Sequence, residues 1–348
     1  MMSANYISTL MLSSSLRSSI TNNQSALTKA SKEATTGRFA DVGLELGTGT
    51  GRDVALRADF NFADQLVDTN ELVSGRLDVT QNRITQLGTT ASEFLKNLIA
   101  ARDADSGAKI IMPSASANLQ DLIGALNVSY NGSYLFGGIN TQTVPVANYV
   151  AGSTSKNQVD ADFLATFGFS QSAAGVSTIT PAQMQNFLDN VLDPEFASPA
   201  WNTNWSSATD QTLSSRISTT EVVDSSVSAN QPGFRKLAEA YTMLTDLGNT
   251  SLSKDTFQVV VDKAIGLVSG AINDLAVLGG TVGSIQQRVT GASEKLKIQK
   301  DILNNQIVKL EAVDPTEASV RVNTLQTQIK TALALTSQLQ QISLINYL

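Results

Sequence analysis

Apolar residues along much of this chain recur at alternating steps of three and four positions, which is the spacing of one helix face. The longest such stripe comprises Leu66, Asn70, Val73, Leu77, Thr80, Ile84, Leu87, Ala91, Phe94 and Leu98, and a second comprises Val282, Ile285, Val289, Ala292 and Leu296. Stripes of this kind form the a/d surface of a coiled coil, which needs a partner helix to be buried. The pattern therefore predicts long helices that pair within the chain.

The longest predicted helix runs from about Arg52 to Arg102 and would be on the order of 70 Å long at 1.5 Å per residue. Asn70 and Thr80 are polar positions in its stripe, and such positions usually fix register at some cost in stability. The Gly279-Gly280 pair is expected to break the returning helical pattern, and Asp314-Pro315 to interrupt it again. Further helices are expected over residues 13–36, 114–128, 284–313 and 318–348.

The middle of the chain has a different character. Five of the seven prolines and both tryptophans lie between residues 141 and 233. The aromatic and β-branched residues at Phe163, Phe167, Phe169, Val176 and Ile179 favour short strands. Thr180-Pro181-Ala182-Gln183 has the form of a capping box with proline at the first helical position. Just before this region, Asn131-Gly132 predicts a hairpin turn.

These elements predict a mainly α fold. Long N- and C-terminal coiled-coil helices would form an elongated bundle, with an inserted, β-rich α+β domain between them. The expected division is a terminal helical assembly domain (1–45 and 314–348), a helical-bundle core (46–140 and 234–313) and a variable inserted domain (141–233).

Composition limits the chemistry that the chain can carry. Its 348 residues include no cysteine and no histidine, and the formal net charge is −7. The first absence excludes disulfides and thiolate sites, and the second excludes the commonest general base and a Ser-His-Asp triad. The negative charge argues against nucleic acid as a partner. We also expect no membrane partner, because no apolar run approaches the ~20 residues of a membrane span, and the first ten residues are a poor signal peptide.

Three patterns in the sequence are compared with known kinds of chemical site. The glycine-rich stretch Gly43–Gly51 lacks the spacing of a phosphate-binding loop and is interpreted as a flexible connector. The pairs Asp160/Asp162 and Asp193/Glu195 lack the further ligands of a calcium loop and are interpreted as solvated acidic loops. Trp201 and Trp205 could form a sugar platform, although a packing role is favoured. We therefore expect no catalytic, cofactor or metal site, with an enzyme or carbohydrate-binding module in the middle domain as the minor alternative.

The terminal helices have a different predicted role. They are thinly apolar and nearly uncharged, and no charged side chain follows Lys330. An ordinary bundle within the chain is one interpretation, and packing between copies of the chain is the one we favour. The residues expected at that assembly interface are Leu16, Ile20, Leu27, Val322, Leu325, Ile329, Leu339, Ile342, Leu344 and Tyr347.

Four motifs, in order, resemble one known family. Leu27-Thr28-Lys29 through Thr35-Thr36-Gly37-Arg38 is similar to its N-terminal signature, and Asn131 to Gly138 (NGSYLFGG) to a turn common in its junction members. Asp314 to Ala318, with Leu325, Gln326 and Ile329, resembles the C-terminal signature, and the chain ends in Ser343-Leu344-Ile345-Asn346-Tyr347-Leu348. The sequence thus resembles the bacterial flagellin superfamily, and within it the hook-filament junction branch (hook-associated protein 3). It departs in the glycine-rich stretch Asp41–Asp53, where many members have a Ser-x-x-Asp-Asp-Pro sequence.

The resemblance implies a function. It predicts a structural, non-enzymatic subunit without cofactors, exported by the flagellar type III apparatus and located outside the cell at the hook-filament junction. Its partners would be other copies of itself in a helical layer, the first hook-associated protein, flagellin, and a cytoplasmic export chaperone. The close alternative is a flagellin filament subunit. The chain's lack of cysteine fits travel through a narrow channel unfolded.

Overall fold

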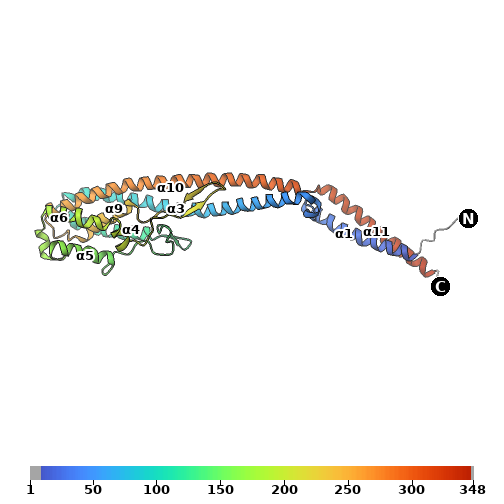
Figure 1. Ribbon diagram of the computed structural model, residues 1–348, viewed down its shortest axis with the longest axis horizontal. Coiled ribbons are helices and arrows are strands. Elements are labelled where there is room, and N and C mark those ends of the chain that lie inside the picture. Colours follow the sequence, from blue (N-terminus) through green and yellow to red (C-terminus); the bar gives the residue numbers. More distant parts are fainter. Residues whose placement is uncertain (1–8, 346–348) are drawn as a thin grey trace. The chain divides into compact units, whose positions relative to one another are not determined.

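The computed structural model describes residues 9–345, with side chains described for residues 11–341. Packing divides the chain into two units, which are described separately. Unit 1 contains residues 1–65 and 297–348, and unit 2 contains residues 66–296. Two long helices, α3 (Thr50–Arg102) and α10 (Lys254–Glu311), contribute to both units (Figure 1).

Within unit 2, α3 and α10 pair antiparallel along the apolar stripes. Leu77, Ile84, Phe94, Val282 and Val289 are buried, as the 3–4 spacing predicts. Polar contacts mark the register, since Gln286 Nε2 donates to Asp78 Oδ1 at 2.7 Å and Arg102 pairs with Asp262. The predicted long helix is therefore confirmed to within two residues at its start.

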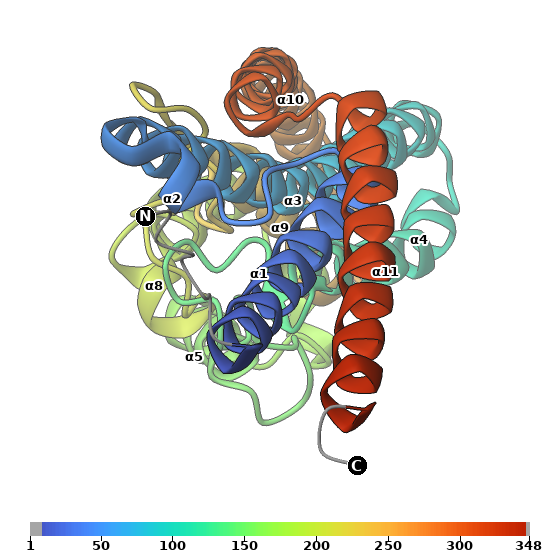
Figure 2. The same ribbon diagram turned by 90° about the vertical axis from the view of Figure 1, so that its right-hand side faces the viewer.

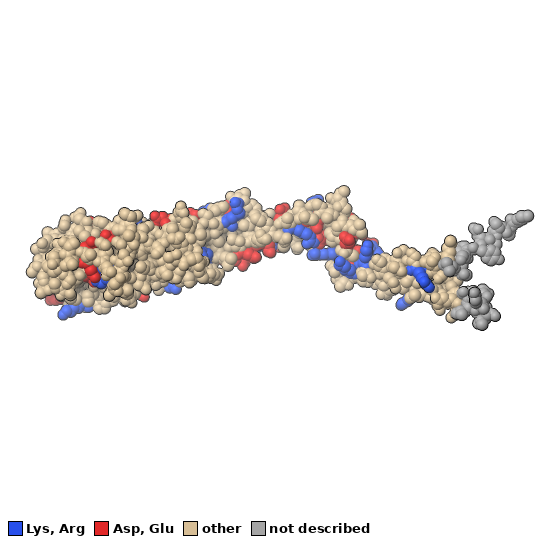
Figure 3. Space-filling view, turned by 60° about the horizontal axis from the view of Figure 1, so that its bottom comes forward, with Lys and Arg blue, Asp and Glu red and all other residues tan. Residues whose placement is uncertain are grey.

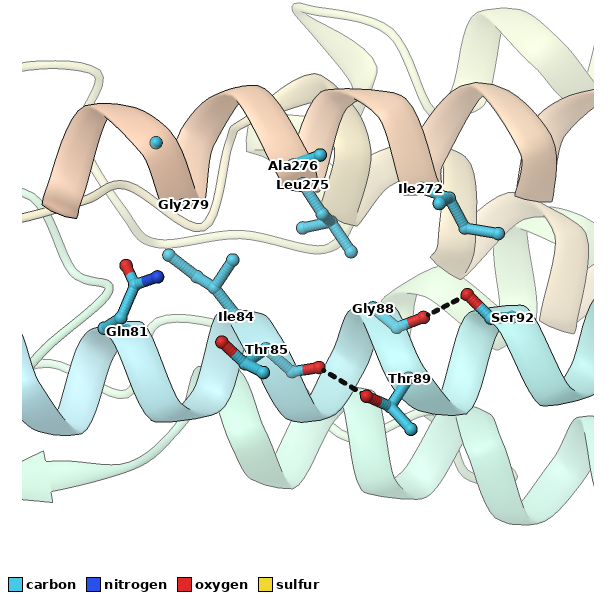
Figure 4. Close-up of a pocket in the computed structure, with 11 residues that line it drawn as sticks. Gln81, Ile84, Thr85, Gly88, Thr89, Ser92, Ile272, Leu275, Ala276 and Gly279 are labelled. Atoms are coloured by element: carbon cyan, nitrogen blue, oxygen red, sulfur yellow. Dashed lines mark hydrogen bonds between the residues drawn. The ribbon is translucent and has the colours of Figure 1, made fainter.

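The expected helix break at Gly279-Gly280 is wrong, because α10 continues through both glycines. Two helical glycines cost only about 1 kcal/mol each relative to alanine, and packing can offset that cost. Gly279 lies against Gln81 and Ile84 of α3, where an added Cβ would be 3.4 Å from Gln81 Nε2. Figure 4 shows these two side chains directed toward Gly279. The glycine thus allows a close helix–helix approach.

The core of unit 2 is completed by α4 (Gly107–Leu126) and α9 (Pro232–Asp246), which pack against each other. Between α4 and the middle region lies the antiparallel hairpin of β1 (Ser129–Tyr130) and β2 (Ser133–Tyr134). Its turn residues Asn131 and Gly132 have φ values of +50° and +76°. Two successive positive φ values are what a tight hairpin turn requires, so the predicted Asn-Gly turn is confirmed.

The middle region is more helical than the sequence pattern predicts. Its elements are α5 (Thr154–Phe167), η2 (Ala174–Thr178), α6 (Pro181–Phe187), η3 (Leu188–Leu192), α7 (Asp193–Glu195), α8 (Ala200–Asn204), β3 (Ser214–Arg216) and β4 (Val222–Asp224). The strands expected around Phe163–Ile179 are wrong. Phe163 and Phe167 lie one turn apart on α5, with ring centroids 4.6 Å apart, and Val176 and Ile179 belong to or follow a 3₁₀ turn. Aromatic β propensity is overridden here by packing in a helical cluster.

The capping box is confirmed. Thr180 Oγ1 accepts from the Gln183 backbone N–H at 3.3 Å, and Gln183 Oε1 accepts from the Thr180 N–H at 3.0 Å. The short helix α6 that follows buries Met184 and Phe187. These join one continuous core that also contains Leu122 and Phe234 of the flanking helices. Packing therefore groups residues 141–233 with the helices, and the three-part division stays a prediction about function.

A second antiparallel hairpin, β3–β4, is held by α3 and α10. Buried Asn70 Nδ2 donates to the carbonyl of Ile217 at 2.9 Å, and Arg288 Nε donates to Glu221 Oε1 at 2.8 Å. Asn70 is the polar residue in the long apolar stripe. Its amide thus forms a hydrogen bond to the residue that follows β3, whereas the Thr80 hydroxyl donates to the carbonyl of Arg76 in its own helix.

Among helices within residues 9–345, α10 meets the length and composition of a membrane span. A core helix of a soluble protein passes the same test, so this alone is weak evidence. Charged residues along α10 form ion pairs within the chain, among them Asp262 with Arg102, Lys263 with Asp189, and Asp274 with Lys236. These pairs are typical of a helix packed in a protein rather than in lipid.

Candidate assembly interface

The terminal helices α1 (Thr9–Thr36) and α11 (Pro315–Ile345) lie side by side and antiparallel in unit 1 (Figure 2). We call them the terminal pair. Small residues allow close approach, since Ala30, Ala318 and Ala332 are all buried. Charges are sparse along both helices, and Figure 3 shows only isolated red and blue patches on the face it presents (Figure 3). The pair therefore buries a narrow apolar stripe of mainly small residues, with the charged Glu33 also buried in it.

The predicted assembly residues lie on that stripe. All seven whose side chains are described are half-buried: Leu16, Ile20, Leu27, Val322, Leu325, Ile329 and Leu339. The side chains of Ile342 and Leu344 lie outside the described residues, as does Tyr347 altogether. In the single chain, then, these seven residues are partly covered, on two helices that pack against each other. Their role in contacts between copies stays a prediction.

Sequence reasoning missed a different set of residues on these helices. Large apolar side chains exposed in the single chain are Met11, Leu12, Val320, Leu333 and Leu335. Leu333 is 52% exposed and Leu335 is 47% exposed. With 3.6 residues per turn they lie on opposite flanks of the Ala332–Leu339 stripe. The apolar arc of α11 is therefore wider there than one partner helix covers, a signal that the heptad pattern alone did not show.

The chain turns between the terminal pair and the long helices at Gly37. This glycine has φ +67°, a left-handed value that a β-carbon would strain. The Phe39 N–H donates to the Glu311 carbonyl, and the Val313 N–H donates to the Gly37 carbonyl, both at 2.9 Å. These bonds form an antiparallel bridge between Arg38 and Ala312. The predicted family signature Thr36-Gly37-Arg38 is thus the place where the two chain halves are joined.

The glycine-rich stretch after this bridge has regular secondary structure, whereas the sequence analysis interpreted it as a flexible connector. It forms α2 (Val42–Leu46) and a 3₁₀ turn, η1 (Gly47–Gly49), before α3 begins. Asp41 caps α2, because its Oδ1 accepts from the Leu44 N–H at 3.0 Å. The segment thus leads directly into the long helix.

Uncharged side chains line the groove along the long helices of unit 2. A groove of ≈ 580 Å³ between α3 and α10 is lined by uncharged residues from Gln81 to Ser92 and from Ile272 to Gly280 (Figure 4). Its hydroxyl groups on Thr89 and Ser92 donate to carbonyls one turn back. Among the residues described, no cluster of three or more carboxylates could hold a metal ion.

The two tryptophans are interior residues rather than a sugar platform. Trp201 and Trp205 are 0% and 2% exposed, and their rings stack with centroids 5.5 Å apart. Tyr149 stacks on Trp205 at 5.1 Å, and Trp201 Nε1 donates to Asn230 Oδ1 at 2.9 Å. A buried stack cannot offer a ring face to a ligand. The minor alternative, a carbohydrate-binding module, depended on exposed rings of Trp201 and Trp205, and both rings are buried.

The four acidic residues of the two predicted loops lie on helices instead, Asp160 and Asp162 on α5 and Asp193 and Glu195 on α7. Asp162 accepts from Gln158 Nε2 and Glu195 from Asn204 Nδ2, both at 2.9 Å. Asp160 pairs with Lys156 on α5 at 2.5 Å. Asp189 and Asp193 share Lys263 of α10 at 2.9 and 3.2 Å. Lys156 also pairs with Asp246 of α9 at 2.9 Å, so these ion pairs link α5 to α9, and η3 and α7 to α10.

Glu239 is an acidic residue of α9 that lies in the interior. Its side chain is buried in α9, and Oε1 has no hydrogen-bond partner. Burial, together with the nearby carboxylates of Asp193 and Asp189, raises the pKa of Glu239 to about 8, and the opposing charge of Lys263 lowers it in part. The folded state therefore binds a proton that the unfolded state releases near pH 4.5.

This proton predicts a pH dependence. Because the folded pKa is raised, the stabilisation is complete below the unfolded pKa and is lost as pH rises through about 8. The Glu239→Gln variant should not show this fall in the free energy of unfolding with rising pH. Chemical unfolding at pH 4.5, 7 and 9 should show wild type losing on the order of 4 kcal/mol relative to Glu239→Gln over that range. Equal slopes for the two proteins would contradict the assignment.

A model of the bacterial flagellin N-terminal helical region matches residues 7–141, and one of the C-terminal helical region matches residues 265–348. Together they cover well over half of the chain. The chain belongs to the bacterial flagellin family. It is accordingly a structural component of the flagellum, and its family is not one of enzymes.

One solved structure similar to this flagellin-family chain is described as a flagellar hook-associated protein from Vibrio parahaemolyticus. The TM-score is 0.52 at 7% identity, over 76% of this chain and 97% of that one. At that identity the likeness shows a shared fold. A search of curated proteins found no match. The expected mainly α fold, with long terminal helices and a small sheet-containing middle region, is confirmed by these comparisons.

Proposed function

We propose that this flagellin-family chain is the adaptor subunit that joins the hook to the flagellin filament. The observation that carries the proposal is the fold shared with a flagellar hook-associated protein over nearly all of that chain. The C-terminal sequence Ser343–Leu348 supports it, because it resembles junction proteins more than flagellins. The first hook-associated protein would bind on one side, flagellin on the other, and a cytoplasmic chaperone would escort the chain to the export apparatus.

In this proposal the terminal pair makes the contacts between copies. The stripe between α1 and α11 is already half-buried, so the flanking residues Leu333 and Leu335 are free to pack against a neighbour. Each subunit would offer one surface and receive a different one, which builds a helical layer rather than a closed dimer. The absence of charge after Lys330 suits such a layer, because an unpaired charge is costly to remove from water.

Deletion of the gene tests the adaptor role. The expected result is cells with complete hooks, no filaments, and flagellin shed into the medium, with filaments restored by the wild-type gene. Filaments of normal number in the deletion strain would overturn the proposal. Loss of filaments with no other flagellin in the medium would instead favour the flagellin alternative.

Purified protein separates the same two alternatives directly. Filament seeds are mixed with this chain alone, with flagellin alone, or with both, and seed length is measured by electron microscopy. The adaptor should leave seeds at their starting length, whereas flagellin lengthens them. Steady elongation by this chain alone would identify it as a filament subunit.

A further inference from the structure

We propose that two ionic clusters at the base of the terminal pair fix the register of α1 against α11 in the single chain, before any second copy binds. Together we call them the base clasp: Lys32, Glu33, Arg38, Ala40, Arg57, Glu311 and Arg321. All lie in unit 1. The inference rests on contacts within one chain and stands apart from the proposed junction role.

The first cluster surrounds Glu33, in the last turn of α1. Its side chain is only 8% exposed. Oε2 lies 3.2 Å from Arg321 Nη1 of α11, and Oε1 accepts from the Ala40 N–H at 3.2 Å. Lys32 Nζ donates to the carbonyl of the same Ala40 at 2.8 Å. One carboxylate thus contacts both the partner helix and the segment that follows α1.

The second cluster surrounds Glu311, at the end of α10. Its side chain is 1% exposed and receives Arg57 of α3 on Oε1, while Arg38 Nη1 lies 3.3 Å from Oε2. Arg57 is itself held by Asp53 at 3.1 Å. A buried carboxylate is costly unless cations pair with it, so this position strongly favours the native arrangement over alternatives. The Arg38–Ala312 backbone bridge lies between the two clusters.

The distal half of the terminal pair has no comparable device. Among side chains described over residues 11–28 and 331–341, none forms an ion pair. Its stripe is half-buried and includes polar Asn23 and Thr336. A polar stripe residue fixes register when it bonds across the helix pair, but Thr336 Oγ1 donates to the carbonyl of Ala332 in its own helix. The few apolar contacts that remain distinguish poorly between one alignment and the next. The contacts at the base therefore set the alignment of α1 and α11 at the distal end as well.

Register matters because it decides which side chains face outward. A slip of one turn moves α11 by about 5.4 Å along α1 and shifts the positions of Leu333 and Leu335 relative to α1. By excluding that slip in advance, the base clasp would reduce the ordering cost that each subunit bears when it joins a neighbour.

Hydrogen exchange of the full-length monomer, at a concentration where it does not polymerise, tests the clasp. In wild type, amides over residues 26–36 and 315–325 should exchange more slowly than those over 11–20 and 331–341. Glu33→Gln keeps an oxygen for the Ala40 N–H but removes the ion pair, and Glu311→Gln removes the buried charge. Each should speed exchange at the base by about tenfold.

Glu317→Gln is the matched control, because Glu317 pairs with the same Arg321 at 2.9 Å but is exposed. It should leave base exchange within about twofold of wild type. Amides of α9 in unit 2 report whether a variant is folded. If Glu33 and Arg321 act as one pair, the double variant Glu33→Gln/Arg321→Met should exchange no faster than the less protected of the two single variants, Glu33→Gln and Arg321→Met. Three results would each overturn the proposal. They are equal exchange rates at the base and the distal end in wild type, effects of the two single variants that add in the double variant, and an effect of Glu317→Gln as large as that of Glu33→Gln.

Discussion

Replacing Trp201 with alanine is expected to lower the free energy of unfolding of unit 2 by about 3–5 kcal/mol, the range for removing a buried aromatic side chain. Trp201 is fully buried, and its ring stacks on Trp205. Alanine would leave a cavity and would also remove the donor to Asn230 Oδ1. That amide oxygen also accepts from Ser206 Oγ at 2.7 Å, so the hydroxyl bond would remain.

Urea unfolding of the full-length chain, followed by tryptophan fluorescence and near-ultraviolet circular dichroism, measures this effect. Leu164→Ala is the control, because Leu164 lies on α5 with its side chain 52% exposed. It should change stability by less than about 1 kcal/mol. If Trp201→Ala left the unfolding midpoint unchanged, the tryptophan would not be the interior residue that its packing indicates. The experiment thus also tests the sugar-platform alternative.

Much of the fold could be predicted from the sequence because its signals are local and repeated. The apolar stripe from Leu66 to Leu98 places α3 correctly, since every turn adds to the same period. The Asn131-Gly132 turn and the Thr180 capping box were predictable for the same reason. Each depends on a few adjacent residues whose backbone preferences agree with the final structure.

Errors arose where distant residues decide the outcome. The helix continues through Gly279-Gly280 because α3 supplies Gln81 and Ile84 as close neighbours. The Glu311 cluster was not predicted because Arg57 lies 254 residues away in the chain. Nothing in the local sequence indicates that these charges meet.

The assembly residues illustrate a subtler limit. A heptad stripe identifies the residues that a helix buries against its first partner, and Leu16, Ile20 and Leu325 of that stripe are half-buried in the single chain. Residues that remain for a second partner lie beside the stripe, and only the structure shows that Leu333 and Leu335 stay exposed. The proposed assembly needs both sets, so the periodic pattern predicts only the residues that face the first partner helix.

Changing both Leu333 and Leu335 to aspartate should therefore abolish assembly while leaving the monomer folded. Both side chains are about half exposed in the single chain, so the charges cost little there. In a layer of copies each leucine would bury apolar area worth about 1.5–3 kcal/mol, and each aspartate would instead need to be removed from water. The critical concentration for assembly should rise at least about a hundredfold.

Sedimentation of the purified variant and rescue of filament growth in a deletion strain measure this loss, and thermal unfolding measures the monomer. Leu333→Met/Leu335→Met is the matched control, because it keeps apolar side chains of similar volume at the same positions. It should assemble like wild type, and the aspartate variant should unfold within about 2 °C of wild type. Normal assembly by the aspartate variant would show that neighbours pack elsewhere on the terminal pair. Loss of assembly by the methionine variant would instead indicate that leucine shape, rather than apolar character, is what the neighbour recognises.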